Sequence, residues 1–547
     1  MDFDFIVVGA GSSGCVLASE LTLDPACRVL LLESGPPDTS PLIHMPRGIG
    51  KLLTPGNPHV WSYKASKGPG RGTEDWLKGR TLGGSSSVNG MVYMRGLPSE
   101  YDDWAAAGCE GWGWTDIGRC YKAMEDHELG EAEWRGVGGP VKVSIHPNDN
   151  PLYEAILNAG VQAGVPRVED VNAALQGGLG YQPRTISDGK RWSAAKAFLD
   201  PARSRKNLVV RTGVHVQRVM FEGTRAVGVE LCDAKGGGLS IVRAAREVIL
   251  SAGALQTPML LQTSGVGPAD LLQRLGIPVV AHAAGVGRHL LEHRCMMMQV
   301  RLHEGSLNRE YQGWRLGKNL LRYFTSQSGP MTCAAHEVCG LIKTRPDLPR
   351  PDAELGIGLY SINVKDGKVV LEDQPGMTWV GYFTTPDSEG SVQISSRDGR
   401  AAPVIDANYL HTERDKRHSV DLVRAMRRIL TQPALAPYVV AETQPGPAFV
   451  SDDELVEAYS QFGSTAFHVS GTCRMGADAS SVVDPQLRVR GVQALRVVDT
   501  SIMPTLISGN TNGAAMAMGL RAAEMIRGSR AAERQGAGEK QIACALI

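Results

Sequence analysis

The chain has 547 residues, of which 42% are hydrophobic and 21% are charged. This is the composition of an ordinary globular protein that is long enough to form two connected domains. Its 57 lysines and arginines balance 57 aspartates and glutamates, so no basic excess favours a nucleic-acid partner. The ten cysteines are scattered, without the paired spacing of a zinc site or a disulfide framework, and no metal is expected.

The N-terminal residues Met-Asp-Phe-Asp lack the basic region of an export signal, so a cytoplasmic location is expected. One uncharged run, residues 500–520, is long enough to cross a bilayer but contains Pro504, Asn510 and Asn512. The surroundings of a buried cofactor explain such a run better than lipid does. Membrane contact is therefore not expected.

The first predicted element is a short apolar strand, residues 5–8, followed by a glycine turn and a helix over residues 15–21. In the turn, Gly9 permits a tight bend, Gly11 lets the backbone approach a pyrophosphate, and Gly14 lets the helix meet the strand. The N-terminus of the helix directs free N–H groups toward phosphates. This pattern is typical of a dinucleotide-binding unit.

A second apolar strand, residues 29–32, ends at Glu33, the acid expected to bind ribose hydroxyls. An acid at this position argues against a 2′-phosphate and so against NADP. FAD and NAD both use such a turn, so a flavoprotein and a nicotinamide-dependent dehydrogenase both remain possible on these residues alone.

The next feature is a run of small residues, 79–90, whose backbone can pass close to a flat or anionic group. Composition alone also permits a flexible linker here. The run resembles the first signature of the glucose-methanol-choline (GMC) oxidoreductase family along its whole length, and residues 253–267 resemble the second signature. The likeness extends from residue 4 to about residue 527 and favours the bacterial alcohol dehydrogenases and oxidases of that family.

This resemblance implies an α/β fold (α+β overall), in which a Rossmann-type FAD-binding domain is interleaved with a substrate-binding domain of antiparallel sheet plus helices. The expected FAD-binding domain comprises residues 1–145, 186–300 and 464–530, and the substrate-binding domain comprises residues 146–185 and 301–463. Residues 531–547 are expected to form a flexible tail. Alternating patterns predict strands at 378–384 and 390–396, and apolar spacing predicts a helix at 421–430.

The resemblance also implies FAD as the cofactor, with binding residues assigned position by position. The glycine turn would face the pyrophosphate, and Glu33 would face the ribose. Gly83, Gly84, Ser87 and Asn89 would lie along the flavin, the backbone of Val216 would meet the adenine, and Asp499 and Asn512 would hold the ribityl and pyrimidine end. Some family members attach FAD through a histidine just before that asparagine; here the position is Val88, so non-covalent FAD is expected.

Oxidation of an alcohol needs a base beside the hydroxyl while the α-hydrogen leaves as hydride to flavin N5. Histidine suits this role, although most of the thirteen histidines will be structural. Family members place the base ahead of a Gly-Thr-Cys run, which is His468 here, and the second catalytic position falls on Asn510. An amide can bond the substrate oxygen but cannot take its proton. His289 and His293 are expected to pack within the flavin domain.

Phe467, next to the expected base, is a candidate contact for an apolar substrate, although core packing explains it equally well. Choline dehydrogenases usually continue from the histidine to proline, whereas Val469 and Ser470 follow here, as in bacterial oxidases of hydroxymethylfurfural and aryl alcohols. A non-sugar primary alcohol is therefore expected, with oxygen or a quinone-like carrier as electron acceptor. A lyase-type flavin reaction remains an alternative, while the intact histidine and asparagine pair argues against a photodecarboxylase or a silent flavin-binding module.

Overall fold

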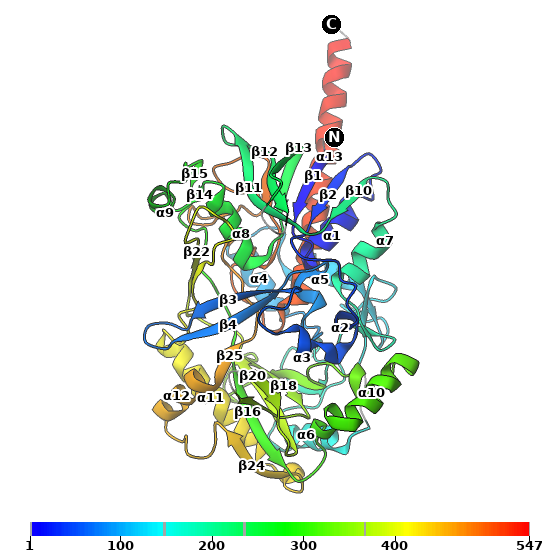
Figure 1. Ribbon diagram of the computed structural model, residues 1–547, viewed down its shortest axis with the longest axis vertical. Coiled ribbons are helices and arrows are strands. Elements are labelled where there is room, and N and C mark those ends of the chain that lie inside the picture. Colours follow the sequence, from blue (N-terminus) through cyan, green and yellow to red (C-terminus); the bar gives the residue numbers. More distant parts are fainter. Residues whose placement is uncertain (1–2, 146–148, 234–236, 366–367, 546–547) are drawn as a thin grey trace.

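The computed structural model describes residues 3–145, 149–233, 237–365 and 368–545. Two sheets of seven strands each lie toward opposite ends of the body, and a smaller sheet lies between them (Figure 1). The functional site described below is built from parts of all three.

The first large sheet has the strand order β10-β2-β1-β13-β12-β11, with β26 pairing to β13. Its strands are β1 (Phe3–Val8), β2 (Val29–Leu32), β10 (Leu208–Arg211), β11 (Val214–Glu222), β12 (Arg225–Asp233), β13 (Ser240–Leu250) and β26 (Leu495–Val497). β10, β2, β1, β13 and β26 pair in parallel, whereas β13, β12 and β11 pair antiparallel. The apolar side chains of β1 and β2 are buried, as expected for parallel strands that are covered on both faces.

Two helices that are far apart in the sequence pack together beside this sheet. They are α1 (Ser12–Leu21) and α13 (Thr511–Ala545). The Ser13 hydroxyl donates to the carbonyl of Ala515 at 2.7 Å, and a Cβ on Gly519 would lie 3.1 Å from the Ser13 backbone. The last part of α13, which includes most of the expected tail, continues as a helix that projects from the body (Figure 1).

The second large sheet has the order β24-β16-β21-β18-β17-β7, with β25 pairing to β16, and all its pairs are antiparallel. Its strands are β7 (Gly178–Tyr181), β16 (Arg294–Leu302), β17 (Val338–Ile342), β18 (Ala353–Gly358), β21 (Gly376–Phe383), β24 (Val439–Gln444) and β25 (Gly463–Thr465). Helices α6 (Pro151–Gln162), α11 (Glu413–Leu430) and α12 (Asp452–Phe462) share a hydrophobic core with it. Residues of β16, β18 and β21, among them Met297, Glu354 and Val380, line the cavity of the site.

The intermediate sheet has the order β22-β23-β3-β4. Its strands are β3 (Val60–Ser66), β4 (Thr73–Gly79), β22 (Ser391–Gln393) and β23 (Val404–Asp406). Further helices are α2 (Pro41–His44), α3 (Ile49–Leu52), α4 (Pro98–Ala106), α5 (Trp114–Met124), α7 (Asp200–Ala202), α8 (Gly253–Thr263), α9 (Ala269–Arg274) and α10 (Gly313–Ser326). The remaining strands are β5 (Glu125–His127), β6 (Val141–Val143), β8 (Ile186–Ser187), β9 (Lys190–Arg191), β14 (Val266–Gly267), β15 (Ala281–His282), β19 (Ile362–Lys365) and β20 (Lys368–Leu371).

The mixed α/β architecture with an antiparallel second sheet confirms the predicted fold class. The strand predicted at 378–384 is β21, whereas the one at 390–396 is shortened to β22. The helix predicted at 421–430 begins earlier, because Thr412 caps α11 by accepting from the N–H of Asp415 and the first turn is charged rather than apolar. The division into two domains stays a prediction; β16 runs across its expected boundary after residue 300.

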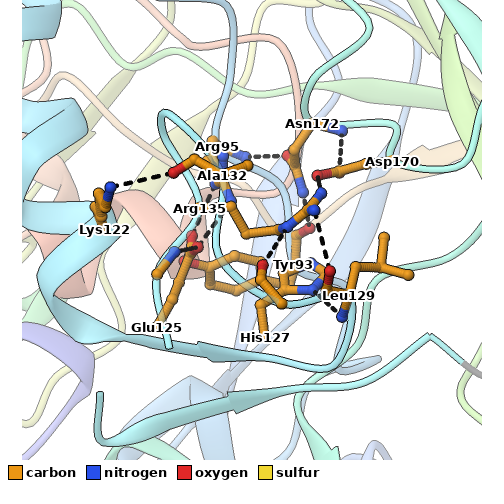
Figure 2. A network of polar contacts seen from close by, with 12 residues as sticks. Tyr93, Arg95, Lys122, Glu125, His127, Leu129, Ala132, Arg135, Asp170 and Asn172 are labelled. Carbon is orange, nitrogen blue, oxygen red and sulfur yellow. Dashed lines mark hydrogen bonds and ion pairs between the residues drawn. The ribbon is translucent and has the colours of Figure 1, made fainter. Parts of the chain in front are cut away.

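One buried ion-pair network lies away from the site, between β5, β6 and the segment near residue 170 (Figure 2). Arg95 donates two hydrogen bonds of 2.7 Å each to the carboxylate of Glu125, which also accepts from the hydroxyl of Tyr93 and the N–H of Gly136. Both charged side chains are almost fully buried. We call these four residues the Glu125 network.

No helix in the described part of the chain combines the length and the hydropathy that a membrane span requires. The uncharged run 500–520 instead forms a short 3-10 turn and the start of α13, and most of its side chains are buried in the protein core.

Candidate functional site

A cavity of about 1630 Å³ runs through the interior, between the glycine turn after β1 and one face of β18 and β21. Eleven of the residues predicted for the site line it: Gly9, Gly11, Glu33, Gly84, Asn89, Val216, Phe467, His468, Asp499, Asn510 and Asn512. Gly14, Gly83 and Ser87 lie behind its wall. The structure therefore brings together candidates that the sequence spreads over 500 residues.

The glycine turn is shaped by close backbone contacts. Gly9 has a φ of +100°, and a Cβ there would lie 2.5 Å from the carbonyl oxygen of Ser251. A Cβ on Gly14 would lie 1.9 Å from the Gly9 carbonyl, so helix and turn could not approach as they do. At Gly11 the nearest atom would be 3.8 Å away, and this residue begins α1 without a side-chain cap. The first-turn N–H groups are thus left for an anionic ligand.

Glu33 follows β2 and reaches the cavity beside that turn. Its two carboxylate oxygens accept from the N–H of Gly35 at 2.8 Å and of Ala10 at 3.1 Å. Burial raises the pKa of Glu33 to about 7, against the lowering effect of those two N–H groups. Further hydroxyl donors at this carboxylate, such as those of a ribose, would favour its ionised form.

The second glycine-rich run packs over the first turn. Gly83 donates its N–H to the carbonyl of Ala10 at 2.8 Å, and a Cβ on Gly84 would lie 2.7 Å from the Cα of Gly11. The Ser87 hydroxyl bonds to the backbone within the run. Gly83 and Ser87 therefore shape the run, while Gly84 faces the cavity.

Asn89 lies at the end of the same run with a fixed amide. Its Oδ1 accepts from Nη1 of Arg191 at 2.7 Å and from the N–H of Met91 at 3.1 Å. The amide nitrogen is then the atom that remains for a ligand in the cavity. The neighbouring Val88 is buried and packs in one cluster with Phe467.

Asp499 and Asn512 also line the cavity and are both held by hydrogen bonds. Asp499 accepts from the N–H groups of Gly253 at 2.9 Å and Ser501 at 2.8 Å, which fixes the start of α8 against the turn after β26. Asn512, in the first turn of α13, accepts from the Ser12 hydroxyl at 2.7 Å. Val216 lies in β11 where its pairing with β12 shifts register.

His468 is the centre of a chain of three hydrogen bonds. Its Nε2 lies 2.9 Å from Nδ2 of Asn510, and its Nδ1 lies 3.0 Å from Nδ1 of His293. The Nε2 of His293 in turn lies 2.8 Å from the carbonyl oxygen of Thr384. Asn510 and His468 line the cavity, whereas His293 is completely buried behind them.

The direction of these hydrogen bonds follows from the carbonyl at the far end. A carbonyl only accepts, so Nε2 of His293 donates to Thr384. A neutral His293 then accepts at Nδ1, which obliges His468 to donate from its own Nδ1. A neutral His468 consequently carries its lone pair on Nε2, the nitrogen that faces Asn510 and the cavity.

Both imidazoles are neutral at physiological pH. Burial lowers the pKa of His468 well below 6.5, and the charges of a protonated His293 and of Lys78 lower it further. Burial also lowers the pKa of His293 to about 4, although its bond to Thr384 opposes the shift. Each ring therefore carries a single N–H, as the directions of these hydrogen bonds require.

The peptide before His468 is strained and is held by neighbouring side chains. Phe467 has a φ of +64°, an uncommon conformation for a bulky residue. Its N–H donates to the Thr465 hydroxyl at 2.8 Å, and its carbonyl accepts from Nζ of Lys78 at 2.6 Å. The N–H of His468 donates to Glu292 at 2.8 Å. These bonds orient the imidazole from its backbone.

The side chains of Lys78 and Glu292 interact electrostatically next to His468. Burial raises the pKa of Glu292 to about 8, and the nearby ammonium of Lys78 opposes that rise. Burial lowers the pKa of Lys78, and Glu292 opposes the fall. The second oxygen of Glu292, Oε2, is buried without a hydrogen-bond partner in the described structure.

Sequence reasoning did not identify three of the residues that hold His468. His293 was expected to pack in the flavin domain, and Lys78 and Glu292 belong to none of the assigned positions. They come from β4 and from the segment before β16, so only the fold brings them to residue 468. The one feature of the sequence that could have indicated a role for Lys78 is its position directly before the run of small residues 79–90.

The chain is similar to known proteins over nearly its whole length. Two family models described as GMC oxidoreductase, an N-terminal and a C-terminal one, match residues 3–295 and 386–519. Human mitochondrial choline dehydrogenase is 41% identical over 97% of this chain and 90% of its own length, and the Escherichia coli K12 oxygen-dependent choline dehydrogenase is 39% identical over 98% of each. The crystal structure of pyridoxine 4-oxidase from Mesorbium loti has a TM-score of 0.85 and 32% identity, and covers 96% of this chain and 99% of that one.

Proposed function

Because the chain belongs to the GMC oxidoreductase family, we propose that it oxidises a primary alcohol to the aldehyde, with His468 as general base and Asn510 positioning the substrate oxygen. Family membership confirms the predicted enzyme class, an FAD-dependent oxidoreductase acting on CH–OH donors. The proposal is carried by one observation: Nε2 of His468 and Nδ2 of Asn510 lie 2.9 Å apart in the wall of the cavity.

The residues at the other end of the cavity fit FAD. The uncapped start of α1 suits a diphosphate, the carboxylate of Glu33 suits ribose hydroxyls, and Asn89 lines the same cavity as His468. When bound, FAD supplies the acceptor for the hydride that leaves the alcohol carbon. Val88 has no atom that could form a covalent link, so acid precipitation should release the yellow colour into the supernatant. Colour retained by the pellet would contradict non-covalent binding.

The proton of the alcohol passes to the lone pair on Nε2 of His468. His468 needs no prior deprotonation, because its pKa lies well below 6.5. During the transfer the imidazole keeps its Nδ1–H bonded to His293, which prevents the ring from turning and keeps Nε2 toward the cavity. The tautomer required for catalysis is thus set from the carbonyl of Thr384 through His293.

Asn510 stabilises the oxygen as it loses its proton. In the present arrangement its Nδ2 donates to the lone pair of His468. An incoming hydroxyl takes that place at Nε2, and the released N–H of Asn510 then donates to the same oxygen, where negative charge develops. The Oδ1 of Asn510 is buried without a partner in the described structure, so substrate or solvent can reorient this amide at little cost.

Choline oxidation is a second candidate, which one carboxyl group in the cavity favours. Glu354 lines the cavity, accepts from the Tyr382 hydroxyl at 2.6 Å, and has its pKa raised by burial to about 8. A quaternary ammonium beside it would favour the ionised carboxylate. The guanidinium of Arg47 also lines the cavity, however, and its fixed positive charge opposes a cationic substrate. We therefore rank a neutral or anionic primary alcohol first.

Anaerobic visible spectra of the purified protein test the proposal. Bleaching of the oxidised flavin bands by decanol or benzyl alcohol, but not by choline, is the expected result. Bleaching by choline alone would replace it with the second candidate. Flavin bands that persist with every alcohol would contradict an alcohol oxidation and favour a non-redox flavin reaction of the lyase type.

A further inference from the structure

An arginine that forms no ion pair with any other described residue lies in the wall of the cavity. Arg47, in the 3-10 turn Pro46–Gly48, has its guanidinium 4.8 Å from the ring centre of Tyr311 and 4.7 Å from that of Tyr360. Its Nε and Nη2 are buried and, in the described residues, bond to no acceptor. Stacking between two rings accounts for the faces of the guanidinium but leaves its in-plane donors unused.

The position of Arg47 relative to His468 follows from the strand register. Tyr382 packs against His468, with ring centres 5.5 Å apart, and Tyr382 and Thr378 both line the cavity from β21. The Thr378 hydroxyl donates to the backbone carbonyl of Tyr360, whose ring lies under Arg47. Thr378 and Tyr382 are four positions apart in β21, a rise of about 14 Å along the strand. Arg47 therefore lies toward the Thr378 end of this strand, and we call the part of the cavity between His468 and Arg47 the substrate half.

A second unpartnered polar group lies in this half. Gln182 is only 2% exposed, lines the cavity, and neither polar atom of its side chain has a hydrogen-bond partner in the described structure. Its backbone N–H bonds to Glu337, the neighbour of His336. Burial, assisted by the charge of Arg47, lowers the pKa of His336 to about 4, so this imidazole is neutral and adds no charge.

The space between the two ends is largely apolar. Met297, Val380 and Ala335 line it, and no carboxylate in the described residues pairs with Nε or Nη2 of Arg47. A ligand that fills this half must present apolar surface along the sheet face and hydrogen-bond acceptors at its end. Leaving buried donors unpaired is costly, so a matching acceptor is recognised strongly there.

We propose that Arg47 and Gln182 form a carboxylate-binding subsite, and that the substrate class is a primary alcohol joined by an apolar chain to a carboxylate. The subsite rests on the proposed alcohol oxidation. It adds that the hydroxyl lies at His468 and the carboxylate at Arg47, toward opposite ends of the β21 segment from Tyr382 to Thr378. A terminal hydroxydecanoate has a chain of suitable length, and choline has the wrong charge.

The test compares hydroxydecanoate with decanol in the wild type and in Arg47→Met, which keeps an unbranched side chain but removes the charge. We expect kcat/KM for hydroxydecanoate to fall by at least about 10-fold, and that for decanol to change by less than about twofold. Arg225→Met, at an exposed position that begins β12, should change neither. Equal losses on both substrates, or no loss on either, would overturn the subsite.

Binding of decanoate, which has no hydroxyl to oxidise, separates this inference from the proposed function. Calorimetry should show that the wild type binds decanoate and that Arg47→Met binds it at least about 10-fold more weakly. If decanol bleaches the flavin but decanoate binding is independent of Arg47, the subsite fails and the alcohol oxidation stands. If decanoate binds through Arg47 but no alcohol bleaches the flavin, the carboxylate subsite stands and the proposed alcohol oxidation fails.

A different observation concerns the outer surface of α10, at the edge of the body in Figure 1. One face of this helix points inward: Leu316 and Leu320 line the cavity, and Tyr323 is buried. The opposite face carries Trp314 and Phe324, which are 74% and 63% exposed. Among the described residues these are the two aromatic side chains with large exposure, and Leu321 beside them is 67% exposed.

Basic side chains flank this exposed face. Arg315, Lys318 and Arg322 recur at helical spacing and are exposed, and α10 contains no acidic residue, although Glu310 just before it pairs with Arg315. Exposed tryptophan, leucine and phenylalanine beside a row of basic residues are typical of helices that lie in the surface of a bilayer. Anionic headgroups complement the basic row.

The geometry points to docking of α10 on an anionic lipid bilayer, with the cavity wall formed by Leu316 and Leu320 directly behind the contact. This surface contact needs no membrane span, and it departs from the expectation of no membrane contact, which considered spans alone. It is independent of the reaction catalysed.

Flotation with vesicles tests the docking. The wild type should float with vesicles of equal parts phosphatidylglycerol and phosphatidylcholine and at least about 10-fold less with phosphatidylcholine alone. The triple variant Trp314→Ser, Leu321→Ser, Phe324→Ser should lose this binding while keeping its flavin spectrum and melting temperature. The control Leu23→Ser, Val450→Ser removes exposed apolar groups elsewhere and should float like the wild type.

Three outcomes would overturn the docking: a wild type that floats with neither vesicle, a triple variant that floats unchanged, or a dimer in size-exclusion chromatography that the triple variant abolishes without any vesicle binding. The last result would mean that a second copy of the chain covers α10.

Discussion

Two clusters of buried polar side chains differ in how their hydrogen bonds are completed. In the Glu125 network, both oxygens of the carboxylate accept from protein donors, and the arginine forms a bidentate pair (Figure 2). Around His468, by contrast, Oδ1 of Asn510 and Oε2 of Glu292 are buried without partners in the described structure. Only the second cluster borders the cavity.

The difference separates stability from function. Completed polar bonds favour one packed arrangement and leave nothing for a ligand. Incomplete bonds raise the free energy of the folded state, and they persist where a substrate or cofactor supplies the missing partner. Substitutions in the first cluster should therefore change unfolding, and substitutions in the second should change turnover.

The largest effect on stability is expected for Glu125→Ala. It leaves the charge of Arg95 buried and unpaired, and the free energy of unfolding should fall by about 3–5 kcal/mol. Denaturant unfolding measures this, and the folded fraction should retain turnover within about twofold. Glu222→Ala breaks an ion pair whose side chains are about 60% exposed and should cost less than about 1 kcal/mol. Similar losses for the two variants would contradict the role of the buried network.

The largest effect on turnover is expected for His468→Ala. Without the acceptor at Nε2, kcat should fall by at least about 10²-fold, the low end for general base catalysis. The yellow cofactor should remain bound and the melting temperature should change little, because the site bonds are not optimised for stability. Stopped-flow flavin reduction measures the chemical step, and near wild-type reduction would exclude His468 as the base.

Sequence patterns predicted the part of the site that is local in the chain. Gly9, Gly11 and Glu33 follow one another within a single strand-turn-helix-strand unit, so their spacing is enough to predict a dinucleotide site. The assignments of His468 and Asn510 came from family resemblance, since a histidine in isolation is usually structural. Those roles stay proposals, whereas the fold class and the FAD cofactor are confirmed.

The remaining part of the site depends on tertiary contacts. His293 and His468 are 175 residues apart, and their contact requires β16 and β25 to pair, which no local pattern reports. Arg47 is a single basic residue in a short turn. The sequence does not show that Tyr311 and Tyr360 enclose its guanidinium, because that contact depends on the fold. In α10 the apolar spacing is visible in the sequence, but which face points outward is decided by packing on the cavity wall.

A smaller loss of turnover is expected at His293, and two variants separate its positioning role from packing. His293→Leu removes the acceptor for Nδ1–H of His468 and should lower kcat by on the order of 10-fold, because the ring can then adopt the other tautomer. His293→Gln can accept with its oxygen and donate with its nitrogen to Thr384, and should recover most of that loss. Equal defects in the two variants would indicate a purely structural histidine.

The smallest change is expected when acid is added to the wild type. An imidazole with an ordinary pKa of about 6.5 loses about nine-tenths of its neutral form by pH 5.5. Because the pKa of His468 is lowered well below 6.5, kcat/KM should change by less than about twofold between pH 7 and pH 5.5. An acid limb near pH 6.5 would show that the base is not desolvated as the structure has it.

Between pH 7 and pH 5.5 the free energy of unfolding should fall even though kcat/KM stays nearly constant. The pH experiment therefore needs a control for unfolding. The unfolded chain binds a proton at residue 293 near pH 6.5, whereas the folded protein binds it only near pH 4. Between these values the unfolded state carries more protons, so acidification lowers the free energy of unfolding. Enzyme returned from pH 5.5 to pH 7 should recover full activity; if it does not, loss of fold rather than protonation of His468 explains any decline.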